Sequence, residues 1–191
     1  MLASYHAPSL PVPDVVAMVG EGARTLVARA LARASVAADP DEALPRFLDA
    51  YDQRLTATTT LYDGVADTMA HLHRHGCVSV LTNKPQQPTD VILEALGLAP
   101  LIDAAIGGDT EYGRKPAPGA LQSLVERSGI PAEETLMVGD SWVDVATAGA
   151  AGIDACLVAY GFGYPAVDAD HLARARWTVA AFSELTRFIG V

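Results

Sequence analysis

The sequence of 191 residues is short of cysteine, of aromatic residues and of basic residues. Its two cysteines, Cys77 and Cys156, are too few for a disulfide framework, and each falls in a predicted strand, so we expect buried, reduced thiols. The apolar runs are too short to span a bilayer, and residues 1–13 lack the basic start and long apolar core of a signal peptide. These absences predict a cytoplasmic protein that does not act in a membrane.

The charge balance is acidic, with 13 basic residues against 23 acidic residues and a net charge of −10. The basic residues are spread along the chain, so no cluster would offset repulsion from a phosphate backbone. We therefore expect no nucleic-acid partner. A small anionic substrate would have to be attracted by local donors, such as a lysine or a metal ion.

The chain has enough apolar residues, 50% of the total, to bury a core of the α/β class. Its first part shows two helical patterns, one over 23–34 and one that begins at Pro40, with Asp39 as its cap. No strand pattern separates these helices, so we expect a helical hairpin that packs on itself.

Beyond residues 61–64 the pattern changes to helices that alternate with strands, which favours a parallel sheet with right-handed crossovers. The predicted helices between these strands end at Gly76, Gly97, Gly129 and Gly152, and a last helix is predicted over 183–189. The predicted strands cover residues 77–81, 104–106, 135–138, 153–159 and 177–179.

Thr82 and Asn83 end the first of these strands. A hydroxyl and exposed N–H groups ahead of a helix form a cradle for an anion, because the donors are unpaired and the helix dipole favours negative charge. Threonine and asparagine before Pro85 are also ordinary turn residues. We predict that both residues bind phosphate, with a plain turn as the alternative.

Lys115 precedes the stiff segment Pro116-Ala117-Pro118 and a helix. A fixed ammonium near a phosphoryl group neutralises charge on its oxygens, and the prolines reduce the entropy lost in placing the loop. A solvated surface lysine is the alternative, and Arg114 and Lys84 are rivals for the role.

Asp140 and Asp144 follow a buried strand in the segment Gly139-Asp140-Ser141-Trp142-Val143-Asp144. If a helix begins near Ser141, the two carboxylates point to the same side and repel each other unless a cation joins them. Mg²⁺, with its oxygen ligands, suits such a pair. The alternative is an N-cap aspartate with a second acid in the first helical turn, which needs no metal.

These three motifs, in this order, resemble the haloacid dehalogenase (HAD) superfamily, and most closely its phosphoglycolate phosphatase-like branch. The resemblance implies a doubly wound parallel α/β sheet, a HAD-like Rossmannoid core, with a small all-helical cap. We expect residues 1–60 to form the cap and residues 61–191 to form the core without its first strand.

The resemblance also implies a Mg²⁺-dependent phosphatase that acts on a small phosphorylated metabolite, with phosphoglycolate as the leading substrate. Thr82 and Lys115 would be catalytic and would hold the phosphoryl oxygens. Asp140 would ligate the metal, and Asp144 would hold a metal-bound water or orient Lys115. Arg24 resembles part of the cap loop that faces the substrate, where it would meet a carboxylate; the alternative is a surface residue in the first turn of an exposed helix.

Two further features come from the same resemblance. Asp109, in the segment Gly107-Gly108-Asp109, resembles a residue that supports the site.

The Asp-x-Asp-Gly-Thr stretch that supplies the nucleophile in the family does not precede Thr82. We therefore expect the chain as given to be inactive or weakly active, and Met1 to be internal to a longer reading frame that encodes an active phosphatase. A non-catalytic remnant that binds phosphate and metal is the alternative.

The missing strand has a structural consequence as well. In this fold the first strand lies in the middle of the sheet, so we expect two neighbouring strands to keep unpaired N–H and C=O groups on either side of an apolar gap. Each buried unpaired group costs roughly 1 to 3 kcal/mol.

Overall fold

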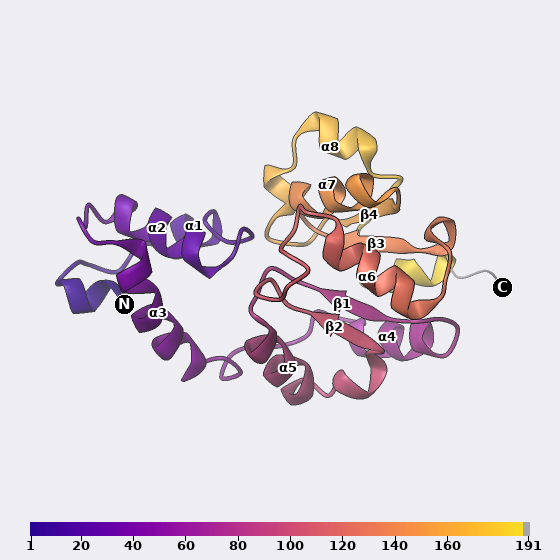
Figure 1. Ribbon diagram of the computed structural model, residues 1–191, viewed down its shortest axis with the longest axis horizontal. Helices are drawn as coiled ribbons and strands as arrows, with labels where there is room; N and C mark the ends of the chain where they lie inside the picture. The colour runs from indigo at the N-terminus through magenta and orange to yellow at the C-terminus, as the bar shows by residue number, and fades with distance from the viewer. Residues whose placement is uncertain (189–191) are drawn as a thin grey trace. The chain divides into compact units, whose positions relative to one another are not determined.

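The computed structural model describes residues 1–188, which fold into two compact units, Met1–Thr58 and a second unit that begins at Thr59. Figure 1 shows helices alone in the first unit and helices around parallel strands in the second. No helix within residues 1–188 is long and apolar enough to cross a membrane.

The first unit is the predicted helical hairpin. Its elements are η1 (Leu2–Tyr5), α1 (Val12–Val16), α2 (Ala23–Arg33) and α3 (Pro40–Asp52). The Asp39 side chain caps α3 by accepting a hydrogen bond of 2.8 Å from the Asp41 amide, as the sequence predicts. Val27 and Leu31 of α2 are buried against Ala43 of α3, so the hairpin encloses a small apolar core of its own.

The strands of the second unit form two separate parallel sheets. β1 (Ser79–Leu81) pairs with β2 (Ala104–Ile106). β3 (Leu136–Gly139) pairs with β4 (Asp154–Val158), and β4 pairs with β5 (Trp177–Val179). The carboxyl ends of parallel strands point the same way within each sheet, which is where open α/β sheets bind their ligands.

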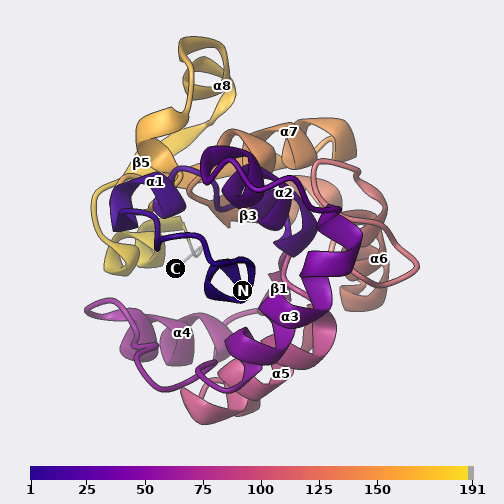
Figure 2. The same ribbon diagram turned by 90° about the vertical axis from the view of Figure 1, so that its left-hand side faces the viewer.

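Helices pack on these sheets. They are α4 (Val65–His73), α5 (Gln86–Ala95), α6 (Gly119–Ser128), α7 (Trp142–Ala151) and α8 (Ala169–Arg174), with short 3-10 turns η2 (Ala99–Leu101), η3 (Ala132–Glu134), η4 (Tyr164–Ala166) and η5 (Phe182–Phe188). Figure 2 shows α7 and α8 on the side of the three-stranded sheet and α4 and α5 on the opposite side of this unit. Gly129 and Gly152 end α6 and α7 with φ of 67° and 72°, a left-handed conformation that glycine adopts without a steric penalty.

A cavity of about 760 Å³ separates β1 from β3, and residues of both strands line it. Each of these strands has a ladder partner on one edge only within the described residues. The divided sheet and the gap between β1 and β3 are what the sequence analysis expects of a core without its central strand.

Two local predictions were wrong. Cys77 is exposed, because β1 begins only at Ser79 and leaves Cys77 in the irregular segment before the strand. The last helix is a 3-10 helix over Phe182–Phe188, and residue 189 of the predicted range lies outside the described residues. Cys156 is buried in β4, and burial raises the pKa of its thiol to about 11.

Candidate active site

Lys115 links the two sheets at their carboxyl ends. Its Nζ lies 2.6 Å from Asp144 Oδ1, and only 13% of the Lys115 side chain and 7% of the Asp144 side chain are exposed. Its backbone carbonyl accepts a hydrogen bond of 3.0 Å from Asn83 Nδ2, next to the end of β1. The lysine is therefore held from both sides and is not a solvated surface residue.

Asp144 uses both of its carboxylate oxygens within the protein. Oδ1 accepts from Lys115, and Oδ2 accepts from the Asp140 amide at 3.1 Å and from the Ser141 amide at 3.0 Å and hydroxyl at 2.6 Å. Ser141, and not Asp140, is the N-cap residue of α7, and Ser141 and Asp144 form a capping box. Asp144 thus starts the helix and orients the lysine at the same time.

Thr82 and Asn83 lie in the loop between β1 and α5. Thr82 Oγ1 accepts a hydrogen bond of 3.1 Å from the Lys84 amide, which is the geometry of a turn. No residue in the described range accepts the hydroxyl proton of Thr82. Asn83 is buried and uses its side-chain amide to hold the Lys115 backbone. Residues 82–84 therefore have the local geometry of a turn, which the sequence offered as the alternative. The prediction that Thr82 and Asn83 bind phosphate stays a prediction.

The loop after β2 supports the loop after β1. The Gly108 amide donates to the Lys84 carbonyl at 2.8 Å, and a Cβ at Gly108 would lie 2.7 Å from the Asn83 carbonyl oxygen. Asp109 Oδ1 accepts a hydrogen bond of 2.7 Å from the Gln86 amide at the start of α5. Asp109 therefore acts on the loop that carries Thr82, and glycine permits the close approach of the two loops.

Asp140 lies at the end of β3 beside the loop that follows β4. Asp140 Oδ2 accepts a hydrogen bond of 2.9 Å from the Gly163 amide, and a Cβ added to Gly161 would collide with the Asp140 side chain. Asp140 and Gly161 border a shallow pocket of about 360 Å³ that Tyr62 and Tyr160 also line. Burial raises the pKa of Tyr160, and the nearby Tyr62 and Asp140 raise it further.

The carboxylate oxygens at this site could provide only part of the ligands of a Mg²⁺ ion. No described residue donates a hydrogen bond to Asp140 Oδ1, so this oxygen is available to a cation. Asp144 is committed to Lys115 and to the start of α7. No group of three or more histidine, cysteine, aspartate or glutamate side chains within residues 1–188 could hold a metal on its own. A Mg²⁺ ion that keeps several waters and binds phosphate oxygens can be held through one carboxylate, so the arrangement is compatible with such an ion.

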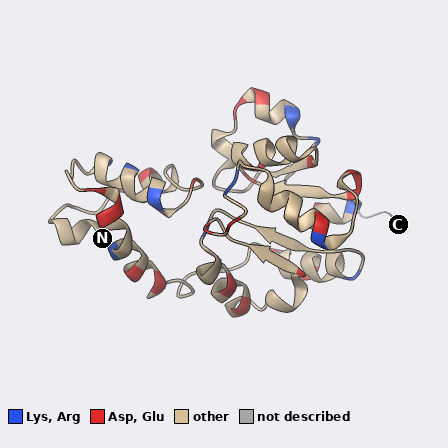
Figure 3. Cartoon of the chain, in the orientation of Figure 1, with Lys and Arg blue, Asp and Glu red and all other residues tan. Residues whose placement is uncertain are grey.

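Arg24 belongs to the first unit, where its guanidinium is already paired. It forms two hydrogen bonds of 2.7 and 2.9 Å with Asp41, which raise the pKa of Arg24 and lower the pKa of Asp41. Figure 3 marks the acidic and basic residues of α2 and its neighbours. The other ion pairs of α2 are Arg29–Glu21 and Arg33–Asp14. The prediction that Arg24 meets a substrate carboxylate stays a prediction.

The structure adds two features that the sequence analysis missed. Ser141 donates both its amide and its hydroxyl to Asp144, and the Gly161-Phe162-Gly163 loop holds Asp140. The spacing of Ser141 and Asp144 is the capping-box pattern, and two glycines in the loop after a strand indicate a close approach of backbone. Both signals are present in the sequence.

The loops at the carboxyl ends of the strands thus carry the Lys115 ammonium, the Thr82 hydroxyl and Asp140 Oδ1. Asp140 Oδ1 accepts no hydrogen bond from the described residues. This combination suits a small oxyanion, because a fixed ammonium and a hydroxyl donor stabilise charge on oxygen.

Comparisons with known proteins indicate the same family as the sequence motifs. The family model of haloacid dehalogenase-like hydrolases matches residues 1–152. The chain is 43% identical over 153 residues to the phosphoglycolate phosphatase of Rhodospirillum rubrum, a match that covers 76% of this chain and 64% of the relative. It is 38% identical over 171 residues to phosphoglycolate phosphatase 1 of Pseudomonas aeruginosa, covering 86% of this chain and 62% of the relative.

A similar fold occurs in the crystal structure of a predicted phosphoglycolate phosphatase from Haemophilus somnus 129PT. The TM-score is 0.89 at 27% sequence identity, and the match covers 99% of this chain and 87% of that one. The chain thus spans slightly less than two thirds of the lengths of the two curated relatives, at 64% and 62%.

Proposed function

Because the chain belongs to the haloacid dehalogenase-like hydrolase family, we propose that its site serves the hydrolysis of small phosphomonoesters, with phosphoglycolate as the leading substrate. The names of the relatives from Rhodospirillum rubrum and Pseudomonas aeruginosa support this substrate. The observation that carries the proposal is the buried Lys115–Asp144 pair, which fixes an ammonium at the carboxyl ends of the strands.

In this proposal each side chain has a distinct task. Lys115 donates to the phosphoryl oxygens, and Asp144 holds it in place. Thr82 donates a hydrogen bond from its hydroxyl to the phosphoryl oxygens. Asn83 positions the loop that carries Lys115. Asp140 offers Oδ1 to Mg²⁺, and the Gly163 amide keeps the carboxylate oriented. When bound, Mg²⁺ would neutralise negative charge on the phosphate.

The chain of 191 residues contains no Asp-x-Asp-Gly-Thr stretch ahead of Thr82, and a covalent phosphoryl transfer needs a nucleophile. We therefore propose that this chain binds phosphate and turns over substrate slowly or not at all. The alternative is a non-catalytic remnant that keeps only a phosphate- and metal-binding pocket.

Two measurements test the proposal. Isothermal titration calorimetry with inorganic phosphate and MgCl₂ should show binding that weakens at least tenfold in Lys115→Met, since a charge-assisted hydrogen bond contributes about 1.5 to 3 kcal/mol. Arg127→Met, on the exposed side of α6, is the matched control and should bind like the wild type. A folded protein that binds no phosphate would contradict the proposed site.

Release of phosphate from phosphoglycolate and p-nitrophenyl phosphate then separates the two functions. Slow Mg²⁺-dependent turnover that Asp140→Ala abolishes supports the phosphatase. Phosphate binding without turnover of either ester supports the remnant.

A further inference from the structure

We propose that His71 and His75, at the carboxyl end of α4, form a binding site for a divalent transition-metal ion of the class of Zn²⁺, Ni²⁺ and Cu²⁺. One nitrogen of each ring would ligate the ion, and water would complete its coordination. The pair precedes the amino end of β1, whereas the proposed active site lies at the carboxyl ends of the strands. The inference therefore does not depend on the proposed function.

The first observation is the spacing of the two rings. His71 and His75 are four residues apart, which places them on one side of the helix end, and their ring centroids lie 4.5 Å apart. Two nitrogens that each lie about 2.0 to 2.1 Å from one Zn²⁺ ion are at most about 4.2 Å from each other. Rings at the observed distance can therefore present one nitrogen each to the same ion.

The second observation is the tautomer of His75. Its Nδ1 lies 2.8 Å from the backbone carbonyl oxygen of His71. A carbonyl oxygen can only accept, so Nδ1 carries the proton and Nε2 keeps its lone pair. Histidines that ligate a metal have this arrangement, in which the other ring nitrogen donates to a carbonyl or a carboxylate. His75 is exposed, so an ion can reach Nε2 from solvent.

Arg74 makes His71 the weaker of the two ligands. Arg74 Nη2 lies 3.4 Å from His71 Nδ1, and a guanidinium can only donate, so this contact places the His71 proton on Nε2. An ion at Nδ1 would displace Arg74. An ion at Nε2 would require the proton to move to Nδ1, which also displaces Arg74. In both cases Arg74 competes with the metal, and its positive charge repels the ion.

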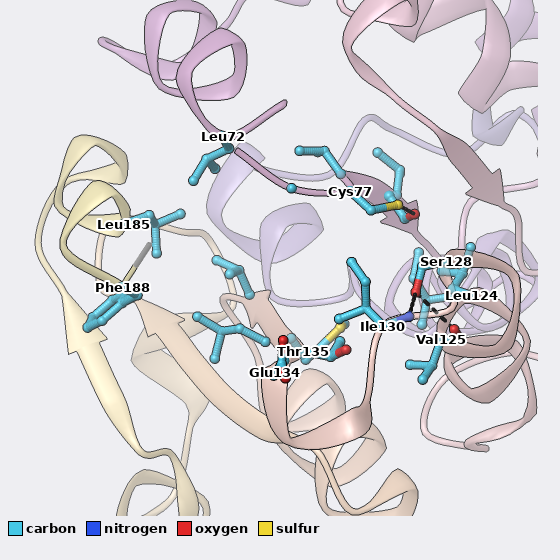
Figure 4. Close-up of a pocket in the computed structure, with 18 of the residues that line it drawn as sticks. Leu72, Cys77, Leu124, Val125, Ser128, Ile130, Glu134, Thr135, Leu185 and Phe188 are labelled. Atoms are coloured by element: carbon cyan, nitrogen blue, oxygen red, sulfur yellow. Dashed lines mark hydrogen bonds between the residues drawn. The ribbon is translucent and has the colours of Figure 1, made fainter. Parts of the chain in front are cut away.

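The helix end that carries the pair is already fixed by packing. Met69 is buried, and Leu72 packs against the buried cluster that contains Leu185. Figure 4 shows Leu72 and Leu185 on the same side of the cavity between β1 and β3. The last carbonyl groups of a helix carry a partial negative charge that favours a cation. Ligands on a packed helix end need little reorganisation to bind an ion.

The ligand type selects the class of ion. Imidazole nitrogen suits Zn²⁺, Ni²⁺ and Cu²⁺, whereas Mg²⁺ prefers oxygen. His73, between the two ligands in sequence, contacts Asp103 instead, with 3.5 Å between its Nδ1 and Asp103 Oδ2. Within residues 1–188 no third histidine, cysteine, aspartate or glutamate joins the pair. The site should therefore bind its ion reversibly through two protein ligands.

Isothermal titration calorimetry with ZnCl₂ tests the proposal. The chain of 191 residues, freed of metal by a chelator, is titrated at pH 7.5 in excess MgCl₂, which occupies sites made of oxygen ligands. His71→Gln and His75→Gln should each weaken Zn²⁺ binding at least tenfold, since each removes one of two ligands. His73→Gln is the matched control on the same helix and should bind within about twofold of the wild type.

Two further measurements identify the neighbours of the ion. Arg74→Gln should tighten Zn²⁺ binding about threefold, because it removes a competing donor and a positive charge. Binding to the wild type should weaken at least tenfold at pH 5.5, where imidazole is mostly protonated and cannot ligate. Zn²⁺ should also raise the melting temperature of the wild type and leave that of His75→Gln unchanged, because an ion held by the folded state stabilises it.

Three results would overturn the proposal. A folded wild-type protein that binds no Zn²⁺ below about 1 mM has no such site. Undiminished binding by His71→Gln and His75→Gln, each shown to be folded by circular dichroism, would place the ion elsewhere, and loss of binding in Asp140→Ala would then place it at the proposed active site. Equal loss of binding in His73→Gln would show that the effect belongs to the helix and not to the pair.

Discussion

The Lys115 ammonium and the Asp144 carboxylate are the most buried oppositely charged pair at the site, with 13% and 7% of their side chains exposed. A buried ion pair is costly to break, because the remaining charge has no compensation in a medium of low dielectric constant. At the scale of single residues, each of these two charges therefore needs the other as its counter-ion in the folded protein.

A double-mutant cycle measures this dependence. Lys115→Met should lower the free energy of unfolding by about 3 kcal/mol, since it leaves the Asp144 charge buried without a counter-ion. Combining it with Asp144→Asn should cost less than the sum of the two changes, with a coupling energy of about 1 to 3 kcal/mol from urea unfolding. Additive effects would show that the pair contributes nothing beyond its separate contacts.

Asp103 controls the start of β1 and should make stability depend on pH. Its Oδ2 accepts a hydrogen bond of 2.7 Å from the Val78 amide, which, with Cys77 and His73 nearby, holds the pKa of Asp103 below its ordinary value. A lowered pKa in the folded state means that the stabilisation is present above about pH 4, the unfolded value, and is lost as the pH falls through the folded value.

Asp103→Asn should therefore destabilise the protein at pH 7 and have a smaller effect at pH 3. The effect at pH 7 should be about 0.5 to 1 kcal/mol, because the side chain is 41% exposed and solvent screens its charge. Urea unfolding at several pH values measures the difference, and Asp63→Asn in an exposed loop is the control. A difference that does not change with pH would exclude the carboxylate as its source.

Among the elements, the loop after β4 determines where Asp140 lies. Gly161 leaves room for the Asp140 side chain, and Gly163 donates to it. Neither contact comes from the motif that carries Asp140, so the position of this carboxylate depends on a segment about 20 residues further along the chain.

Gly161→Ala should displace Asp140, because the added Cβ would overlap its side chain. We expect the variant to lose about 1 to 3 kcal/mol of stability, the usual cost of overpacking, and to lack the increase in melting temperature that we expect Mg²⁺ with phosphate to give the wild type. Gly76→Ala is the matched control, since nothing lies within 4 Å of the position where its Cβ would be. Normal Mg²⁺ stabilisation in Gly161→Ala would show that Asp140 is not the ligand.

Most elements of the fold could be predicted from local patterns. The bounds of β2 and β5 agree with the predicted ranges, and Asp39 and Gly152 mark helix ends as expected, because capping depends on nearby residues alone. β1 is shorter than predicted, since a strand extends only where it has a partner. The partners of Asn83 and Asp140 could not be predicted, because residues 32 and 23 positions away supply them.

At the scale of the whole molecule, the described residues form two compact units, and the boundary between them in the sequence lies at residues 58–59. Neither helix nor strand occurs between the end of α3 at Asp52 and the start of α4 at Val65, and residues 56–60 are exposed. Exposed segments with small polar residues between compact units are the usual sites of proteolysis.

Limited digestion with proteinase K should therefore cut first within residues 56–60 and leave a resistant fragment that begins there. Mass spectrometry of the fragments identifies the new terminus. Early cuts inside α2, α3 or the strands of the second unit would contradict the division into two units.

The double use of Asp144 has a consequence for genetics. One carboxylate begins α7 and restrains Lys115, so a substitution at this position is at once a folding lesion and a chemical one. Loss of activity in a screen of random variants would not reveal which of the two had failed. Suppressors would separate them: a second change that restores protein abundance in cells without restoring activity would assign the remaining defect to the lysine.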